Sequence, residues 1–419
     1  RIKVPFDRRR RVLHHFYTVQ VALRRAAAPA KKLLARKIST PVTQASTYKR
    51  PKSTYPFYAP RFWHGMRMGD WFSLLQENGF RVHPSRWGLA ATVTSATAFN
   101  STACLLDRVI NGQRVADTRL VADPVFIVGH WRSGTTYVHE LMSCDQRFAT
   151  PTTYQCFAAN HFLITEKWIP KLAWFIMPSR RPMDNVKVGW NAPQEDEFAL
   201  CAMGIRSPYL RIAFPETGST HQDWLDFDML SEEQLASWKR GLDLFLRRVT
   251  LSSGKRLILK SPTHTARIGL LREMYPGAKF IHIVRDPHSI YPSTLKLWST
   301  LDEAQGMQLR KHEIKDLIVD SFRRMYGAFE RDRITIPDSD VVDLRYEDII
   351  ANPVGEIERA YAALSLGDFE AVRPGLEKMS MSNKDYRTNT YSPTEEQRAF
   401  VETNFGEYMD RYGYRDQTT

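Results

Sequence analysis

The segment that most constrains the fold runs from Pro124 to Met142. It begins with the apolar run Pro124-Val-Phe-Ile-Val-Gly129, passes through a turn that ends at Gly134, and continues into a stretch with helical character. A buried strand that leads through a glycine turn into a helix directs consecutive backbone N–H groups at one point, and such a point binds anionic groups. The segment therefore predicts a phosphate-binding loop.

The cation of this loop stands in an unusual place. Compared with the nucleoside-triphosphate pattern GxxxxGK[ST], the sequence keeps Gly129, Gly134 and Thr136 but has Thr135 at the lysine position, and the basic residue is Arg132. The lysine of triphosphate enzymes reaches the β- and γ-phosphates while the Ser/Thr holds magnesium. A cation before the second glycine instead suits a donor whose 5' end carries one phosphate and one sulfate.

Alternating apolar runs and helical stretches after residue 120 predict an α/β fold. Strands are expected at 124–129, 256–260, 279–284 and 341–345, and helices at 231–246, 265–275, 289–300, 310–331, 353–364 and 393–412. This alternation is typical of βαβ units, so we expect a P-loop-like, three-layer α/β/α domain with a central parallel sheet. We place that domain at 120–419, after a basic arm and helical extension at 1–119.

A second nucleotide motif strengthens the first. Arg285 ends the expected strand 279–284, is followed by Asp-Pro, and stands eight residues before Ser293. With the loop Arg132-Ser133-Gly134-Thr135-Thr136, this pair resembles the sulfotransferase superfamily, in the arginine version of its phosphosulfate loop found in the tyrosylprotein and bacterial branch.

The resemblance implies the co-substrate 3'-phosphoadenosine 5'-phosphosulfate (PAPS). Residues 132–136 would bind its 5' end, and Arg285 with Ser293 its 3'-phosphate. The family also supplies a basic loop near the C-terminus, for which Lys384 and Arg387 are the candidates, although the GxxGDW element of some branches is absent. The expected reaction is transfer of a sulfuryl group to an acceptor hydroxyl or amine.

Sulfuryl transfer by in-line attack needs fixed cations and a base. Arg132 and Lys260, which ends a strand expected beside the loop, are candidates to stabilise developing charge. The base is sought first in Glu195 or Glu197 and second in His264. The acids could instead complement a helix dipole, and His264 could be structural. Four cysteines without zinc spacing predict no metal site.

Charge is concentrated at the start of the chain. Residues 1–50 contain fourteen Lys or Arg and one acid, Asp7, which leaves 45 basic and 45 acidic residues in the remainder. Short apolar groups between the basic clusters suit helices on an anionic membrane surface, and a solvated packing arm is the alternative. A membrane span needs about 18 consecutive apolar residues, and no run in the sequence reaches this length. We therefore expect a cytoplasmic protein, either in solution or at the periphery of a membrane. Because the sequence starts at Arg1 rather than Met, an anchor or signal upstream stays open.

The sequence says least about the chemical identity of the acceptor. Aromatic stretches at 154–182 and 208–214, with Trp168, Trp174 and Trp190, suit either a hydrophobic acceptor wall or core packing. Small-molecule, lipid, carbohydrate and peptide acceptors therefore stay open. Two other functions compete: a P-loop kinase or NTPase with a degenerate loop, and a non-catalytic anion-binding protein that uses the basic arm. The neutral remainder of the chain argues against a nucleic-acid partner.

Overall fold

A central sheet of five parallel strands organises the computed structural model, which describes residues 55, 59–176, 189–382 and 394–415. The strands follow the spatial order β2-β3-β1-β4-β5. Their bounds are β1 Val125–Val128, β2 Phe148–Ala149, β3 Arg256–Lys260, β4 Lys279–Val284 and β5 Val341–Arg345. The four expected strands are confirmed, and β2 is an addition to them. The parallel α/β fold class is confirmed as well.

Two hydrophobic cores lie on opposite faces of this sheet. Phe126 and Val128 of β1 pack into one core, whereas Val125 and Ile127 pack into the other. Successive side chains of a strand point to opposite faces, so a strand buried on both sides reads as a continuous apolar run. This arrangement explains why the strands are recognisable in the sequence.

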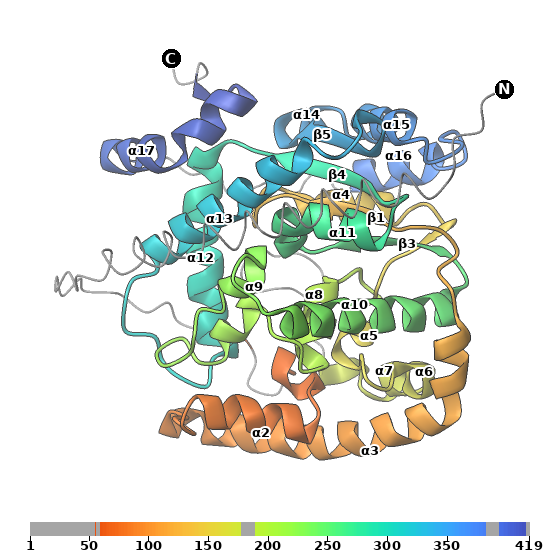
Figure 1. Ribbon diagram of the computed structural model, residues 1–419, viewed down its shortest axis with the longest axis vertical. Coiled ribbons are helices and arrows are strands. Elements are labelled where there is room, and N and C mark those ends of the chain that lie inside the picture. The colour runs from red at the N-terminus through yellow and green to blue at the C-terminus, as the bar shows by residue number, and fades with distance from the viewer. Residues whose placement is uncertain (1–54, 56–58, 177–188, 383–393, 416–419) are drawn as a thin grey trace, which may run out of the picture. The chain divides into compact units, whose positions relative to one another are not determined.

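Helices cover both faces and complete three layers (Figure 1). The core that contains Ile127 is covered by α4 Thr135–Met142, α14 Tyr346–Ala351, α15 Pro353–Leu364 and α16 Arg373–Ser382. The other core is covered by α8 Asp196–Ala202, α10 Glu232–Ser253, α11 Ile268–Met274, α12 Pro287–Gln305, α13 Lys315–Arg333 and α17 Glu395–Tyr412.

Shorter helical segments join these elements. The α-helices among them are α5 Thr153–Phe157, α6 Phe162–Thr165, α7 Ile169–Leu172 and α9 Asp223–Asp226. The 3-10 helices are η1 Phe62–Gly65, η2 Pro84–Arg86, η3 Trp174–Ile176, η4 Pro208–Ile212, η5 Pro262–Arg267 and η6 Asp338–Asp340. The expected capping box is present at the start of α10, where Ser231 and Gln234 bond each other's backbone N–H groups.

Two helices precede the sheet in the sequence, α2 Met68–Glu77 and α3 Trp87–Asp117, and they pack against each other. Trp71 of α2 and Val93 of α3 contribute to the same core as Phe126. Both helices belong to the same compact unit as the sheet, which begins at Tyr48. The expected boundary near residue 120 stays a prediction.

Among the described residues, one helical stretch, 84–117, is long and apolar enough to cross a membrane by length and composition. Only 28% of its most apolar window is buried within the protein. The expectation that the sequence contains no membrane span was based on uninterrupted apolar runs. This stretch instead contains alanine and threonine among its larger apolar residues.

Candidate active site

The phosphate loop connects β1 to α4 and depends on two glycines. Gly129 has a φ of 144° and Gly134 a φ of 103°, a region that disfavours other residues. A Cβ on Gly134 would lie 2.2 Å from Cδ2 of Tyr346, so the close approach of that ring also requires glycine. The Gly129 N–H donates to Oγ1 of Thr265 at 2.7 Å, which fixes the loop to η5.

Ser133 is the most enclosed residue of the loop. Its side chain is fully buried, and its Oγ has no hydrogen-bond partner among the described residues. A buried hydroxyl without a partner is costly unless a ligand completes its bonding. Together with the N-terminus of α4, whose first N–H groups face the loop, Ser133 fits a site for an anionic group.

Arg132, Arg285 and Ser293 meet beside this loop. Nε of Arg132 donates to Oγ of Ser293 at 2.8 Å, and Nη1 of Arg285 donates to the carbonyl oxygen of Arg132 at 2.9 Å. The Arg285 guanidinium also lies 4.1 Å from the ring centroid of Tyr346. The two expected nucleotide motifs therefore share one site, where two guanidinium groups are held at the same end of the sheet.

Lys260 lies between the loop and the acidic segment. Strand pairing places it opposite Ile127 of β1, near the start of the loop. Its Nζ lies 3.3 Å from Oγ1 of Thr136 and 2.6 Å from Oε1 of Glu195. The Lys260 side chain is 2% exposed and that of Glu195 13%, so solvent screens this ion pair poorly.

Tyr209 completes the surroundings of Glu195. Its hydroxyl donates to Oε2 of Glu195 at 2.5 Å and accepts from Nε1 of Trp131 at 2.8 Å. Burial, followed by the negative charge of Glu195, raises the pKa of Tyr209 well above its ordinary value. The phenol therefore stays protonated and keeps donating to the carboxylate.

The other two acids of the run have different partners. Glu197 is fully buried, and its carboxylate accepts from Thr263 Oγ1 at 2.9 Å and from Arg267 Nη1 at 2.7 Å. Asp196 accepts from Ser261 Oγ at 2.9 Å. Each of the two carboxylates thus connects the first turn of α8 to the segment that follows β3.

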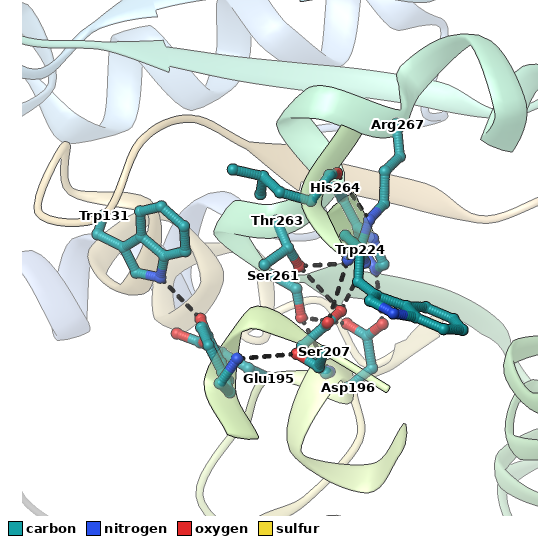
Figure 2. Close-up of polar contacts among 12 residues, drawn as sticks. Trp131, Glu195, Asp196, Ser207, Trp224, Ser261, Thr263, His264 and Arg267 are labelled. Atoms are coloured by element: carbon teal, nitrogen blue, oxygen red, sulfur yellow. Dashed lines mark hydrogen bonds and ion pairs between the residues drawn. The ribbon is translucent and has the colours of Figure 1, made fainter. Parts of the chain in front are cut away.

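His264 pairs with Asp196 and lies in the same buried network (Figure 2). Its Nε2 is 2.6 Å from Oδ2 of Asp196, and both side chains are fully buried. Burial by itself would raise the pKa of Asp196, but the charge of His264 and the hydrogen bonds from His264 and Ser261 outweigh burial and lower it. In Figure 2, Trp131 lies on the other side of Glu195 from His264.

The structure therefore separates the three candidate bases. Glu195 contacts Lys260 at the loop, whereas the side chains of Glu197 and His264 form hydrogen bonds with Arg267, Thr263 and Asp196. Glu197 is buried and fully paired, as is typical of a group that holds elements together, whereas Nδ1 of the buried His264 has no hydrogen-bond partner among the described residues. Lys384 and Arg387 lie outside the described residues, so their assignment stays a prediction.

Two features of the site were not predicted. Tyr209 belongs to an aromatic stretch that was interpreted as either an acceptor wall or core packing, and no role was predicted for Arg267. The pattern Pro-Tyr-Leu-Arg around Tyr209 carries no signal for a donor to a carboxylate. A basic residue three positions after His264 could have suggested a partner for the acidic run, because η5 carries both residues into the core.

A series of aromatic side chains leads away from Glu195. Tyr209 lies 4.9 Å from Phe198 between ring centroids, Phe198 stacks on Phe62 at 3.9 Å, and Phe62 lies 6.0 Å from Phe157. Phe157 in turn contacts Trp190 edge-on at 6.2 Å. Phe62, Phe157, Phe198 and Trp190 are only partly buried, so these rings offer an apolar surface that reaches the carboxylate.

Comparison with known proteins agrees with this geometry. A sequence model of the sulfotransferase family matches residues 124–370. Omega-hydroxy-beta-dihydromenaquinone-9 sulfotransferase Stf3 from Mycobacterium bovis is 42% identical over 362 residues, which cover 86% of this chain and 93% of that protein. The Mycobacterium tuberculosis protein of the same name matches with the same identity and coverage.

Solved structures show the same fold. Sulfotransferase STF9 from Mycobacterium avium has a TM-score of 0.61 at 19% identity and covers 83% of this chain and 96% of its own. Sulfotransferase STF1 from Mycobacterium tuberculosis has a TM-score of 0.57 at 17% identity, with coverage of 84% and 94%. The predicted resemblance to sulfotransferases is thereby confirmed. It replaces the two alternatives, a P-loop kinase or NTPase and a non-catalytic anion-binding protein. The chain belongs to the sulfotransferase family and is an enzyme that transfers a sulfuryl group to an acceptor.

Proposed function

We propose that the donor is PAPS and that the acceptor is a hydroxyl group at the end of a long apolar molecule. One observation carries this proposal: the Lys260–Glu195 pair lies between the phosphate loop and a series of partly buried aromatic rings. A donor in the loop and an apolar acceptor along the rings would meet at this pair.

The donor would use both nucleotide motifs. The 5'-phosphosulfate fits the loop, where Ser133 offers a buried hydroxyl that no described residue bonds and Arg132 offers a cation. The 3'-phosphate fits Arg285 and Ser293, which the structure brings beside Arg132. Lys384 and Arg387 would add charge to the same phosphate by analogy with the family.

Glu195 would act as the general base. It accepts the proton of the acceptor hydroxyl while the acceptor oxygen attacks sulfur, and the bond between sulfur and the 5'-phosphate oxygen breaks. The products are a sulfate ester and adenosine 3',5'-bisphosphate, which keeps the electron pair of that bond. Lys260 would stabilise the charge on the leaving phosphate oxygen, because its ammonium already lies 3.3 Å from the loop residue Thr136.

Donor binding would also free Glu195 from its ion pair with Lys260. In the structure Oε1 of Glu195 is paired with the Lys260 ammonium. The phosphosulfate would compete for this ammonium and weaken the ion pair. Tyr209, held by Trp131, would keep the carboxylate in place while its cationic partner turns to the donor.

The acceptor class follows from the aromatic rings and from the relatives. The two 42% identical proteins are named as sulfotransferases of omega-hydroxy-beta-dihydromenaquinone-9, a molecule with a hydroxyl at the end of an isoprenoid chain. Rings from Phe198 to Trp190 would cover such a chain and exclude water from the hydroxyl. We infer an isoprenoid alcohol of this type as the acceptor.

The test is sulfuryl transfer from labelled PAPS to an omega-hydroxylated isoprenoid quinone by the full chain and by Glu195→Gln. General bases contribute about 100- to 10,000-fold, so Glu195→Gln should lower kcat by at least about 100-fold. Binding of adenosine 3',5'-bisphosphate, measured by calorimetry, should be retained because the amide keeps the shape of the carboxylate.

Glu407→Gln provides the matched control, since this glutamate is an exposed residue of α17. It should transfer sulfate at the wild-type rate. Wild-type kcat in Glu195→Gln would refute the base assignment. A wild-type enzyme that sulfates a peptide tyrosine or a sugar but no isoprenoid alcohol would refute the acceptor class.

A further inference from the structure

The helix α3 is apolar on the outside and polar on the inside. Its buried positions include Asn100, Asp107 and Asn111. Nδ2 of Asn100 donates to the carbonyl oxygens of His64 and Met66, and Asp107 accepts from Arg248 of α10 at 2.8 Å. A surface helix of a globular protein normally shows the opposite pattern.

The solvent side of α3 is uncharged over most of its length. From Trp87 to Leu106 the helix contains no Asp, Glu, Lys or Arg. From Phe99 onward the helix exposes several large apolar side chains. Together they are called the outer face: Phe99, Leu105, Leu106, Val109 and Ile110. Val109 is 84% exposed and Leu105 64%. Contiguous apolar exposure of this kind marks interaction sites.

A second exposed apolar group follows α6. Trp168, Leu172, Trp174 and Phe175 are all exposed, and Trp174 reaches 73%. Lys167 and Lys171 are exposed within the same segment. The edge-on contact of Phe99 with His161 at 5.6 Å and the packing of α3 on α6 connect this segment to the outer face. Figure 1 shows α6 and α7 beside α3, on the side of the molecule away from α14 and α15.

We propose that the outer face and the segment 167–175 dock on a lipid bilayer that contains anionic head groups. Tryptophan side chains favour the membrane–water interface, and lysine can bury its methylene groups while its ammonium contacts lipid phosphates. Arg108 and Arg114 of α3 are exposed beside the outer face and add positive charge. This combination of indole, large apolar and basic side chains matches the chemistry of a bilayer surface.

The geometry assigns α3 to the surface of the bilayer rather than to its interior. Asp107 is fully buried and paired with Arg248, and Asn111 donates to the same carboxylate at 3.2 Å. A helix that crossed the hydrocarbon core would have to give up this ion pair, at a cost of several kcal/mol. The polar inner contacts therefore hold α3 on the domain with its apolar side turned outward.

The docking surface also leads toward the reaction centre, and this step rests on the proposed function. Nε1 of Trp190 donates to the carbonyl oxygen of Ala173, which lies between α7 and Trp174. Trp190 is the last of the aromatic rings that begin at Tyr209. An isoprenoid alcohol could thus leave the bilayer at the segment 167–175 and follow these rings to Glu195.

The test is co-sedimentation of the full chain with vesicles of phosphatidylglycerol and phosphatidylcholine. In the test variant Leu105, Val109 and Ile110 are replaced by Gln. Burial of one such side chain is worth about 1.5–3 kcal/mol, so the triple substitution should lower the partition coefficient at least about tenfold. The replaced side chains are exposed, and the fold should therefore tolerate the change.

The matched control replaces Ile334, Ile350 and Met381 by Gln. These residues are exposed on other elements, and Ile334 has the same exposed fraction, 84%, as Val109. The control should bind vesicles within about twofold of wild type. A repeat at about 1 M salt, where the Debye length is about 3 Å, removes the contribution of the basic residues 1–50, and the difference between the variants should persist.

Three results would overturn the proposal. The wild type could fail to bind vesicles, or the test variant could bind as well as the control, which would assign binding to surfaces other than the outer face. The wild type could also sediment as a dimer that only the test variant dissociates, which would make a second copy the occupant. Adenosine 3',5'-bisphosphate binding, measured in parallel, tests the proposed donor separately, because the outer face contains none of its proposed ligands.

Discussion

At Glu195, Asp196 and Glu197, three consecutive carboxylates serve three different partners. Asp196 and Glu197 lie in the first turn of α8 and turn into the core, where His264 and Arg267 meet them. Glu195 is the N-cap residue with extended backbone angles, so its side chain points to Lys260 instead. The start of the helix thus separates Glu195, the proposed base, from the two acids that face the core.

His130, next to the phosphate loop, gives a prediction for pH dependence. Its side chain is fully buried, and burial lowers its pKa to about 4, opposed in part by the hydrogen bond to the Trp131 carbonyl. The unfolded chain takes up this proton near pH 6.5. The contribution of His130 to stability is therefore complete above about pH 6.5 and is lost as pH falls toward 4, by about 3 kcal/mol in total.

Urea unfolding of wild type and His130→Asn at pH 7 and pH 5 checks this expectation. The free energy of unfolding should fall less between the two pH values in His130→Asn, because one buried neutral imidazole is missing. His312→Asn is the comparison, since this side chain is 56% exposed although its Nδ1 lies 3.2 Å from Oε1 of Glu216, and His130→Asn should change the pH dependence more than His312→Asn does. An equal pH dependence in all three proteins would contradict the buried neutral state of His130.

Individual site residues were predictable where a backbone pattern accompanied them. Arg132 and Arg285 each follow a buried strand. Such strands are recognisable in the sequence as continuous apolar runs, because both of their faces are covered. Tyr209 was not predictable as a donor to Glu195, because the two residues meet through the packing of η4 on α8. The first residue of α8 decides which of Glu195 and Glu197 faces the core, and the sequence did not show where this helix begins.

At the scale of elements, the acidic run fastens α8 to η5. The Glu197–Arg267 pair is fully buried, and Arg267 also donates to the backbone of Leu225, which connects α9 to the same point. Removal of one partner from a buried ion pair costs about 3–5 kcal/mol because the other charge stays buried and unpaired. We expect Glu197→Gln to lower the free energy of unfolding by about 3 kcal/mol.

Chemical denaturation of Glu197→Gln and of the double variant Glu197→Gln, Arg267→Met measures this effect. The double variant should recover part of the loss, since no unpaired charge remains in the core. The exposed Glu407→Gln should match wild type. A loss below about 1 kcal/mol in Glu197→Gln, or a double variant that is less stable than Glu197→Gln, would show that the pair does not hold α8 to η5.

The long elements of the sheet domain were predictable, whereas α3 was expected only as part of a helical extension, without bounds. Strands such as β1 and helices such as α15 follow the periodicity of their apolar residues, which face a core. In α3 the residues that face the domain include Asn100 and Asp107, whereas the large apolar residues face outward. A pattern that assumes an apolar inner face therefore fails on this helix. The strand β2 was missed because it has only two residues.

For the molecule as a whole, the parallel sheet brings the proposed donor site and the proposed base to one end. The loop follows β1, Lys260 ends β3, and Arg285 follows β4. Because these strands are parallel neighbours, their carboxyl ends lie along one edge of the sheet. The proposed acceptor side is built differently, from rings of η1, α5, α8 and η4, and this division explains why the donor motifs were recognisable in the sequence and the acceptor was not.

Donor binding should therefore stabilise the whole molecule through Arg285. A ligand at 100 times its Kd adds about 2.7 kcal/mol to the free energy of unfolding when it binds only the folded state. Adenosine 3',5'-bisphosphate should give this gain in wild type. Charged hydrogen bonds are worth about 1.5–3 kcal/mol, so Arg285→Ala should weaken binding at least about tenfold and lose about 1.4 kcal/mol of the gain at the same ligand concentration.

Thermal unfolding with increasing ligand gives the measurement, with Arg240→Ala as the control because it removes an exposed arginine from α10. The control should keep the wild-type gain, and ATP with magnesium should stabilise all three proteins less than the bisphosphate does. If Arg285→Ala were stabilised as much as wild type, the 3'-phosphate would bind elsewhere. A larger gain with ATP would contradict PAPS as the donor, because the loop would then prefer a triphosphate despite Thr135 at its lysine position.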